Sequence, residues 1–396
     1  MTATVLTQPF ARAEYDDRLR RVRERMAERG LGCLIATDPA NMNYLTGYDG
    51  WSFYTPQCVV LPLEGDVRLF TRQMDANGAR LTTFLGDDEI HGFPDDYVQQ
   101  RDRHPMDWIA GELTRHGLLD GAPVGLEMDA YFFTPRAYES LRACAPRVEF
   151  TDAEELVNWV RAVKSPAEIE LMRAAARIAE KVMRAGIDAI EPGVRQCDAV
   201  AAIYDAQVRG TPETGGDYPA IVPMLPTGEA TSTPHLTWTD DPFVTGEATI
   251  LELAACRRRY HCPIARTVFL GEPPRRLTET AAVTVEGLDV ALAAVRPGAT
   301  CEQVEAAWRE HIARHGLEKS SRIGYSVGIG YPPDWGEHTM SLRPGDTTVL
   351  EPGMTFHMIL GMWMDDWGFE ASETFVVTES GAECLCSFPR ELTVKR

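Results

Sequence analysis

Two polar side chains stand where they could run an acid–base reaction. His235 follows Pro234 within a Gly-, Pro- and Thr-rich stretch that spans residues 215–238. A histidine whose backbone is held by proline can serve as a positioned base, since its ordinary pKa lies close to neutral pH. Glu252 interrupts the apolar stretch ILELAAC, so its carboxylate faces either solvent or a site. A hydrogen-bonded core histidine and an outward-facing strand glutamate are the alternatives.

Two later stretches add side chains that suit a ligand pocket. The segment Gly324–Met340 is rich in glycine, which favours a loop whose backbone approaches a ligand closely. Its candidate pocket residues are Tyr325, Asp334, Trp335, Glu337 and His338. The segment Phe356–Thr378 contributes four more candidates: His357, Trp363, Glu370 and Glu373. The methionines of this second segment are more typical of a core than of a cofactor site.

The strand after Glu252 has the pattern of a metal-binding strand without its ligands. Residues 261–271 read HCPIARTVFLG, a polar start followed by apolar residues and an Arg-Thr pair. Pro263 stands where such a strand would offer an acidic ligand, and Ala265 replaces a second potential ligand. Arg266 remains and fits a structural role.

Composition narrows the class of protein. The chain has 396 residues, which predicts two domains, and its formal net charge is −20. Such a field repels phosphate backbones and anionic membrane surfaces, so we expect no nucleic-acid or membrane partner. No apolar run approaches the roughly 20 residues that span a bilayer. The amino-terminal sequence shows no secretion signal, and nine scattered cysteines fit a reducing cytoplasm.

Residues 1–160 alternate helix and strand signals, which predicts an α/β domain. Charged amphipathic periodicity predicts a helix over 13–29, followed by a short buried strand over 31–37. The runs 58–63 and 66–71 flank a Glu-Gly pair and predict a hairpin.

Residues 161–396 predict a second domain, built on a curved antiparallel sheet. Ser165 followed by Pro166 and Glu168 forms a capping box, which marks a strong helix start near the domain boundary. Strands separated by long loops follow, interrupted by helices predicted over 277–295 and 301–315. The expected fold class is therefore α+β.

The order of several motifs is familiar. Along the chain the motifs RAVKSPAEIELMR, a Pro-His loop, ARTVFLG, GYSVGIG, LEPGMTF and ETFVVTESGAE follow one another in this order. The motif NMNYLTGY lies near the start of the chain. This series resembles the creatinase, prolidase and aminopeptidase P superfamily, the pita-bread enzymes, over nearly the whole chain. The resemblance implies a creatinase-like amino-terminal domain and a carboxy-terminal pita-bread domain.

The resemblance also identifies where metal ligands would stand. The superfamily's metallopeptidases bind two metal ions through two Asp, one His and two Glu. Carried over one at a time, these positions hold Glu252, Pro263, Tyr325, Ile359 and Ser372, with Glu370 and Glu373 close to the last. Proline and isoleucine cannot coordinate a metal through their side chains, whereas a dinuclear site needs several oxygen or nitrogen ligands. We therefore expect neither a metal nor another cofactor.

Within the superfamily, three stretches resemble the metal-free ectoine hydrolases: GGDYPAIVPMLPTG with TSTPHLTW, LELAACRRRYHCPIART, and GYSVGIGYPPDWGE. This implies opening of the cyclic amidine ring of ectoine to N-acetyl-2,4-diaminobutyrate, which a deacetylase would consume, with hydroxyectoine as a further candidate substrate. Glu252, His235 and Tyr325 are the implied catalytic residues, and Asp217 and Tyr218 are further candidates for the pocket. The alternatives are a creatinase-like amidinohydrolase, a non-catalytic binding protein and a metallopeptidase with displaced ligands.

Relatives of creatinase are dimers whose amino-terminal domain reaches into the neighbouring pocket, so the resemblance implies a homodimer. The corresponding loop offers Trp51, Phe53 and Tyr54 as walls for a small polar ring, with ordinary packing as the alternative. Creatinase has an arginine for its substrate carboxylate near the end of this loop, whereas this chain has Thr55. The partner of a substrate carboxylate is therefore left open.

Overall fold

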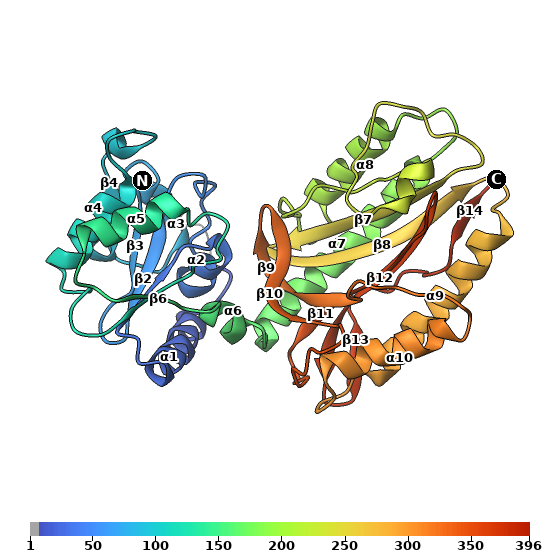
Figure 1. Ribbon diagram of the computed structural model, residues 1–396. Helices are drawn as coiled ribbons and strands as arrows, with labels where there is room; N and C mark the ends of the chain where they lie inside the picture. Colours follow the sequence, from blue (N-terminus) through green and yellow to red (C-terminus); the bar gives the residue numbers. More distant parts are fainter. Residues whose placement is uncertain (1–7) are drawn as a thin grey trace. The chain divides into compact units, whose positions relative to one another are not determined.

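The computed structural model describes residues 8–396, which divide into two compact units between Arg161 and Ala162 (Figure 1). The first seven residues of the stretch in which we expect no secretion signal lie outside the described part. Among the helices of residues 8–396, none combines the length and the apolar composition that crossing a bilayer requires.

The amino-terminal unit is an α/β layer structure around a mixed six-stranded sheet with the order β4-β3-β2-β1-β5-β6. The predicted hairpin is confirmed, because Cys58 pairs with Phe70 in antiparallel register. The strands are β1 Cys33–Ala36, β2 Cys58–Pro62, β3 Arg68–Arg72, β4 Ile90–Phe93, β5 Val124–Leu126 and β6 Phe150–Asp152. The α-helices are α1 Arg12–Glu28, α2 Pro39–Thr46, α3 Ala76–Thr82, α4 Pro105–Arg115, α5 Pro135–Cys144 and α6 Leu156–Arg161. Two short 3-10 helices are η1 Asp87–Glu89 and η2 Asp95–Tyr97.

The alternation of side chains along each strand gives this sheet two apolar faces. On β1, Leu34 and Ala36 join the core beneath α1, whereas Cys33 and Ile35 join the core beneath α4 and α5. Helices therefore cover both faces of the sheet, as buried, continuously apolar strands require.

The NMNYLTGY motif of this unit is structural. Asn41 donates to Glu127 Oε1 and to Asn158 Oδ1, both at 2.6 Å, and accepts from Arg161 Nε at 2.8 Å. Burial raises the pKa of Glu127 to about 7, and Asp38 raises it further, while hydrogen bonds to the carboxylate oppose the rise. The motif thus ties α2 to the end of the unit.

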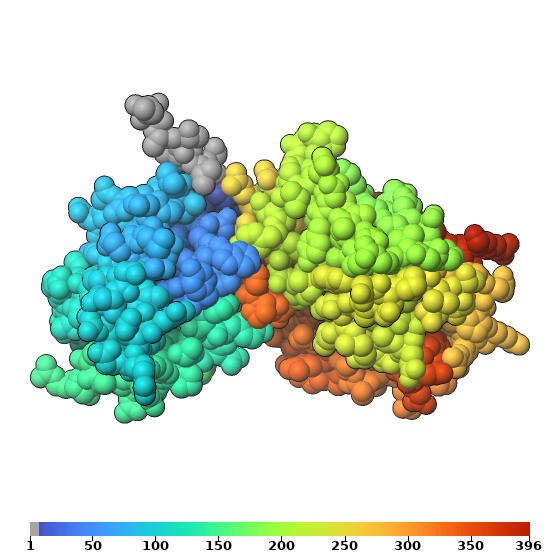
Figure 2. Space-filling view, turned by 90° about the horizontal axis from the view of Figure 1, so that it is seen from above, coloured from blue at the N-terminus to red at the C-terminus, as the bar shows by residue number. Residues whose placement is uncertain are grey.

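Helices α7 and α8 open the carboxy-terminal unit. The predicted helix start is confirmed: α7 spans Pro166–Ala189, Ser165 accepts from the Glu168 N–H, and Glu168 accepts from the Ser165 N–H. Helix α8, Gln196–Arg209, packs beside it, and a long loop containing η3, Gly228–Ser232, leads into the first strand. The green and yellow atoms of Figure 2 show that this α7–β7 stretch forms much of the unit's surface seen from above.

A curved sheet lies between two pairs of helices, which confirms the expected α+β fold (Figure 1). Strands β7 Ala248–Arg257 and β8 Tyr260–Leu270 bury their apolar side against α7 and α8. Strands β11 and β12 bury theirs against α9, Arg275–Ala294, and α10, Cys301–Ala313. The remaining bounds are β9 Gly324–Tyr331, β10 Asp334–Ser341, β11 Thr355–Trp363, β12 Gly368–Thr378, β13 Gly381–Cys384 and β14 Thr393–Lys395. Neighbouring strands are antiparallel except β14, which runs parallel to β8.

The glycine-rich segment Gly324–Met340 is a hairpin of β9 and β10, so its prediction as a loop is wrong. Its glycines serve close strand packing instead. A Cβ at Gly328 would lie 2.6 Å from Glu337 Oε1 and 2.7 Å from Lys164 Cε, where a buried ion pair of 2.5 Å joins these side chains. Only hydrogen atoms fit between the strand and this pair.

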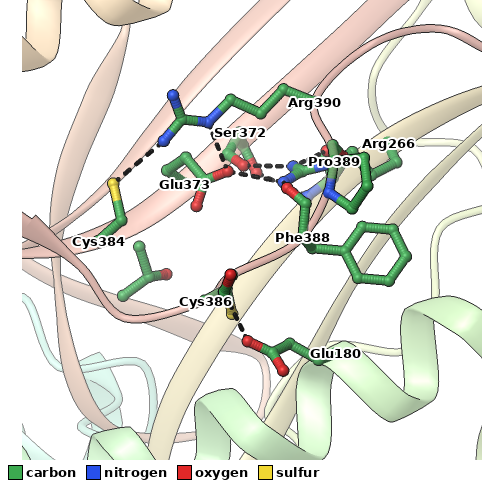
Figure 3. Close-up of polar contacts among 12 residues, drawn as sticks. Glu180, Arg266, Ser372, Glu373, Cys384, Cys386, Phe388, Pro389 and Arg390 are labelled. Carbon is green, nitrogen blue, oxygen red and sulfur yellow. Dashed lines mark hydrogen bonds and ion pairs between the residues drawn. The ribbon is translucent and has the colours of Figure 1, made fainter.

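Arg266 fits the structural role expected for it (Figure 3). Its guanidinium contacts Glu373 Oε1 at 2.6 Å and donates to the backbone oxygens of Ser372, Phe388 and Pro389. Arg390 reaches the same Glu373 oxygen at 3.0 Å. Because Arg266 and Glu373 are each only about 1% exposed, the cluster fastens the carboxy-terminal segment to the sheet through buried charges.

Removing one partner of this cluster should destabilise the protein strongly. We expect Arg266→Met to cost about 3 kcal/mol, because Glu373 is left as a buried carboxylate with only Arg390 beside it. The double variant R266M/E373L should recover much of that loss. The matched control is Arg275→Met, whose partner Glu279 is exposed, and it should change stability by less than about 1 kcal/mol. Denaturant-induced unfolding measures all three, and equal midpoints for R266M and the wild type would contradict the structural role.

Candidate active site

The candidate site lies on the inner face of the curved sheet, the face turned away from α7–α10. The ladder pairs define it: Tyr325 lies opposite His357, Ile359 opposite Ser372, and Gly361 opposite Glu370. Side chains directly opposite each other in a ladder share a face. On β7, Leu251 and Leu253 enter the helix core, so Glu252 between them points to the inner face.

Glu252 is held by two neighbouring backbones. It lies opposite Ala265 of β8, and it exchanges backbone hydrogen bonds with Met224 of the preceding loop at 2.9 and 3.1 Å. The residue is only 4% exposed. Burial raises its pKa well above the ordinary range, and the carboxylates of Glu370 and Asp334 raise it further. An outward-facing strand glutamate is therefore excluded.

Glu370 is the second acid of the inner face. It is 1% exposed, and neither of its carboxylate oxygens has a hydrogen-bond partner among the described residues. Burial raises its pKa to about 7, while the charge of Lys319 opposes the rise. A buried carboxyl group with no donor costs free energy unless it is neutral or meets a cation. Glu370 is thus prepared to receive a cationic ligand.

Lys319 is a site residue that no sequence motif identifies. It lies between α10 and β9, donates to the Gly361 carbonyl at 2.6 Å, and stands 3.9 Å above the Trp363 ring. Burial lowers its pKa to about 8, while Glu370 opposes that shift. No periodic pattern marks a lysine in a loop, so only the fold could place it beside Glu370. Trp363 therefore lies at this end of the site, covering Gly361.

A chain of hydrogen bonds crosses the positions where the superfamily's metal ligands would stand. Trp335 Nε1 donates to the Tyr325 hydroxyl at 2.8 Å, and that hydroxyl lies 3.0 Å from His357 Nδ1. His357 Nε2 lies 2.8 Å from Ser372 Oγ, which accepts from the Ala265 N–H at 2.6 Å. Burial, with Arg322 adding to it, lowers the pKa of His357 to about 3, so its ring is neutral.

A neutral imidazole has one N–H, so the hydrogen bonds from Tyr325 through His357 to Ser372 can be arranged in two ways. In one, Ser372 donates to Nε2 and Nδ1–H donates to Tyr325, whose own proton is then free to donate elsewhere. In the other, Tyr325 donates to Nδ1 and the free proton belongs to Ser372. Burial raises the pKa of Tyr325 well above 10, and Glu252 adds to the rise, so the phenol stays protonated. The first arrangement makes Tyr325 a donor toward Glu252 and its ligand.

Asp334 and His338 close one side of the site from the β9–β10 hairpin. His338 adopts a positive φ of 56°, and its Nε2 lies 3.0 Å from Asp334 Oδ2. Burial raises the pKa of Asp334, but hydrogen bonds from His338 and from the Gly336 N–H outweigh it and lower the pKa overall. Asp334 therefore stays ionised and adds negative charge near Glu252.

His235 is exposed and lies in the loop that borders β7. The Leu225 N–H donates to the Leu236 carbonyl at 3.3 Å, and the neighbouring Met224 pairs with Glu252. The backbone pairing therefore brings the His235 loop to the edge of the strand that carries Glu252. An exposed imidazole at this edge can exchange protons with water, and a buried core histidine is excluded.

Three predicted binding residues have structural roles in this chain. Glu373 faces the opposite side of β12 from Glu370, because neighbouring strand residues alternate, and Arg266 and Arg390 bind it there (Figure 3). The prediction that Glu373 holds a substrate is therefore wrong. Asp217 accepts the Arg258 N–H at the β7–β8 turn. The Tyr218 ring lies 3.5 Å beneath the Arg259 guanidinium.

The aromatic loop of the amino-terminal unit splits into two groups. Phe53 is 6% exposed and packs between Trp51 and Phe132, at 5.0 and 5.1 Å between ring centroids. It is a core residue of its own unit, so its prediction as a pocket wall is wrong. Trp51 and Tyr54 are 57% and 63% exposed. Tyr54 and the part of Trp51 that does not pack on Phe53 are open to solvent.

The inner-face residues do not fit a pair of metal ions. Pro263 and Ile359 offer no donor atom, while Tyr325 and Ser372 already bind His357. Within residues 8–396, the one group of three clustered ligand-type side chains is His91, Glu112 and His116, in the amino-terminal unit. Arg68 and Arg115 contact that group, and their positive charge opposes a bound cation.

Two family descriptions cover most of the chain. "Creatinase/Prolidase N-terminal domain" matches residues 18–163, and "Metallopeptidase family M24" matches residues 170–379. The prolidase structure from Thermococcus sibiricus has a TM-score of 0.84 at 19% identity, covering 96% of this chain and 99% of that one. At this identity the likeness shows the fold.

Two curated relatives are much closer in sequence. The ectoine hydrolase of Halomonas elongata is 48% identical over 98% of both chains. An uncharacterised hydrolase/peptidase of Sinorhizobium fredii is 46% identical, also over 98% of both chains. The motifs, the curved sheet with its outer helices and these matches together show that the chain belongs to the creatinase/prolidase and M24 family of pita-bread hydrolases.

Proposed function

We propose that this protein hydrolyses the cyclic amidine ring of ectoine without a metal ion, giving N-acetyl-2,4-diaminobutyrate. The observation that carries the proposal is the pair of buried acids, Glu252 and Glu370, on one inner face with no metal-binding set around them. Ectoine is a small amidinium ring bearing a carboxylate, so its cation suits two carboxyl groups that are costly to ionise alone. The ectoine hydrolase relative at 48% identity supports this choice of substrate.

The covalent route begins with Glu252. Its oxygen attacks the amidine carbon, forming a C–O bond while the C=N electron pair moves to nitrogen. One ring C–N bond then breaks, and the departing nitrogen takes a proton from His235 as it becomes an amine. A protonated O-acyl imidate remains on Glu252. Water that loses one proton to His235 adds to the former amidine carbon. The C–O bond to Glu252 then breaks with its electron pair returning to the carboxylate, and the hydroxyl proton of the adduct passes to the released amine, which leaves the amide and an ammonium group.

In the direct route, Glu252 only holds the ring cation, and His235 activates the attacking water. The burial of Glu252 and the loop position of His235 suit both routes. The covalent route is favoured, because Met224 and Ala265 fix the backbone of Glu252 on its strand, which limits the positions that its carboxylate can take. The Nα-acetyl isomer is the expected main product.

The remaining inner-face groups have distinct tasks. Glu370 binds an amidine N–H, and Lys319 balances its charge from the side of Trp363. Tyr325 donates to the developing tetrahedral centre, with His357 and Trp335 fixing its oxygen. Hydroxyectoine, which differs by one hydroxyl group, is a further substrate. A deacetylase would consume the product.

The exposed Trp51 and Tyr54 suit an interface in a homodimer, where they would wall the partner's pocket. Nine free cysteines suit a reducing compartment, so the cytoplasm is the proposed location.

Ring opening should be independent of metal and dependent on Glu252. In a proton NMR time course, purified protein should open ectoine equally with and without EDTA. Glu252→Gln should lower turnover by at least about 10², because the amide neither attacks nor balances the cation. The control Glu272→Gln changes an exposed acid and should leave the rate unchanged. Activity lost in EDTA would favour a metallopeptidase, and activity only on guanidino acids would favour a creatinase-like enzyme.

The pH dependence of substrate binding should follow the ionisation of the Glu370 carboxyl group. Because its pKa is raised to about 7, the carboxyl is neutral below that pH and ionised above it. The KM for ectoine should therefore fall as pH rises through about 7, when the anion becomes available to the cation. In Glu370→Gln that midpoint should disappear. Initial rates across the pH range measure it, and a retained midpoint in the variant would assign it to another group.

Tyr325→Phe should lower kcat by about 10² with a smaller effect on KM, because only the hydrogen bond to the tetrahedral centre is lost. Steady-state kinetics on ectoine separates the two constants. The control Tyr204→Phe removes a hydroxyl from α8, where the ring packs against Trp238. Equal kcat values for Y325F and the wild type would remove Tyr325 from the chemistry.

A further inference from the structure

Arg322 is an exposed cation over the Tyr325 ring, at the edge of the inner face, and it has no acidic partner among residues 8–396. It lies two residues before β9, donates from Nη1 to Ser341 Oγ at 3.0 Å, and makes no ion pair with any residue between 8 and 396. Its guanidinium stands 4.4 Å above the Tyr325 ring. Arg266 of the same unit, by contrast, forms an ion pair with Glu373.

The charge of Arg322 acts on the site. After burial, it is the second cause of the lowered pKa of His357, and it also acts on Asp334 and Tyr325. Asp334 is not within ion-pair distance and is already bound by His338 and the Gly336 N–H. Arg322 is exposed, and its guanidinium donates from Nη1 to Ser341, so its other donors can reach a ligand at the edge of the site.

Tyr325 fixes the position of this cation relative to the acids. The phenol ring carries Arg322 on its face, while its hydroxyl group reaches the His357 end, where Glu252 raises its pKa. A positive group thus stands over the ring of the tyrosine whose hydroxyl group is influenced by a negative one. A ligand that carries both a cation and an anion could bind both groups.

Lys319 is a weaker candidate for the same anion. Its ammonium is occupied by the Gly361 carbonyl and the Trp363 ring, and its charge balances the nearby Glu370. It therefore belongs to the acidic end of the site. Arg322 is stacked and keeps its flat donor edge open, which suits bidentate binding of a carboxylate.

We propose that Arg322 binds the carboxylate of the substrate and selects amidines that carry one. This inference rests on the proposed function and names the anion partner that the sequence leaves open. The site would then bind both charges of a zwitterion. Glu252 and Glu370 would bind the amidinium, and Arg322 would bind the carboxylate. A neutral or purely cationic ring of the same size would lose the second contact.

The test compares two rings that differ only in the carboxylate: ectoine and 2-methyl-1,4,5,6-tetrahydropyrimidine. In Arg322→Gln, the KM for ectoine should rise by about 10- to 100-fold with kcat within about threefold, because a charge-assisted pair is lost from binding. For the ring without a carboxylate, kcat/KM, or the inhibition constant if it is not opened, should stay within about twofold. Arg322→Lys should fall between, since it keeps the charge without the planar fork.

Arg314→Gln is the control, because it removes an exposed arginine at the end of α10. An unchanged KM for ectoine in R322Q would overturn the anchor while leaving the proposed function intact. An equal loss on both rings would also overturn it, since Arg322 would then act only by fixing Tyr325. If the wild type neither opens nor binds ectoine, the proposed function and the anchor both fall. If R322Q misfolds, R322K carries the same comparison.

Discussion

The burial of two carboxyl groups on one face of a sheet is the constraint around which the site is built. Glu252 and Glu370 raise each other's cost of ionisation, and Glu370 lacks any hydrogen-bond donor among the described residues. Such a pair is stable when it holds a proton or meets a cation. A positively charged ring can therefore displace a proton here and gain more from the carboxylates than it would in water.

The groups around the two acids leave it to a ligand to supply the cation that replaces the proton on the carboxyl pair. His357 is kept neutral by burial, Tyr325 stays protonated, and Lys319 is held against Trp363 rather than paired directly with Glu370. Of these groups only Lys319 offers the acids a positive charge, and its ammonium is held by the Gly361 carbonyl and the Trp363 ring. The same sheet carries a buried ion pair, Arg266 with Glu373, on the opposite side of β12, where it stabilises the fold.

The fold was largely predictable because its signals are local and periodic. The capping box at Ser165 marked the start of α7, and the apolar neighbours of Glu252 indicated a buried strand. The site was less predictable. Glu370 and Glu373 look alike in sequence, and only the register of β12 shows which one faces the ligand. Lys319 and Arg322 lie outside any repeating pattern, so their roles emerged only when the fold placed them beside Glu370 and Tyr325.

The histidine bridge between Tyr325 and Ser372 has an evolutionary consequence. His357 binds both residues at positions where metallopeptidases of the superfamily keep ligands, so each substitution there depends on the other two. Restoring one ligand alone would break a hydrogen bond of the bridge and leave a buried polar atom unsatisfied, without completing a metal site. A return to metal binding would therefore require several of these positions to change together.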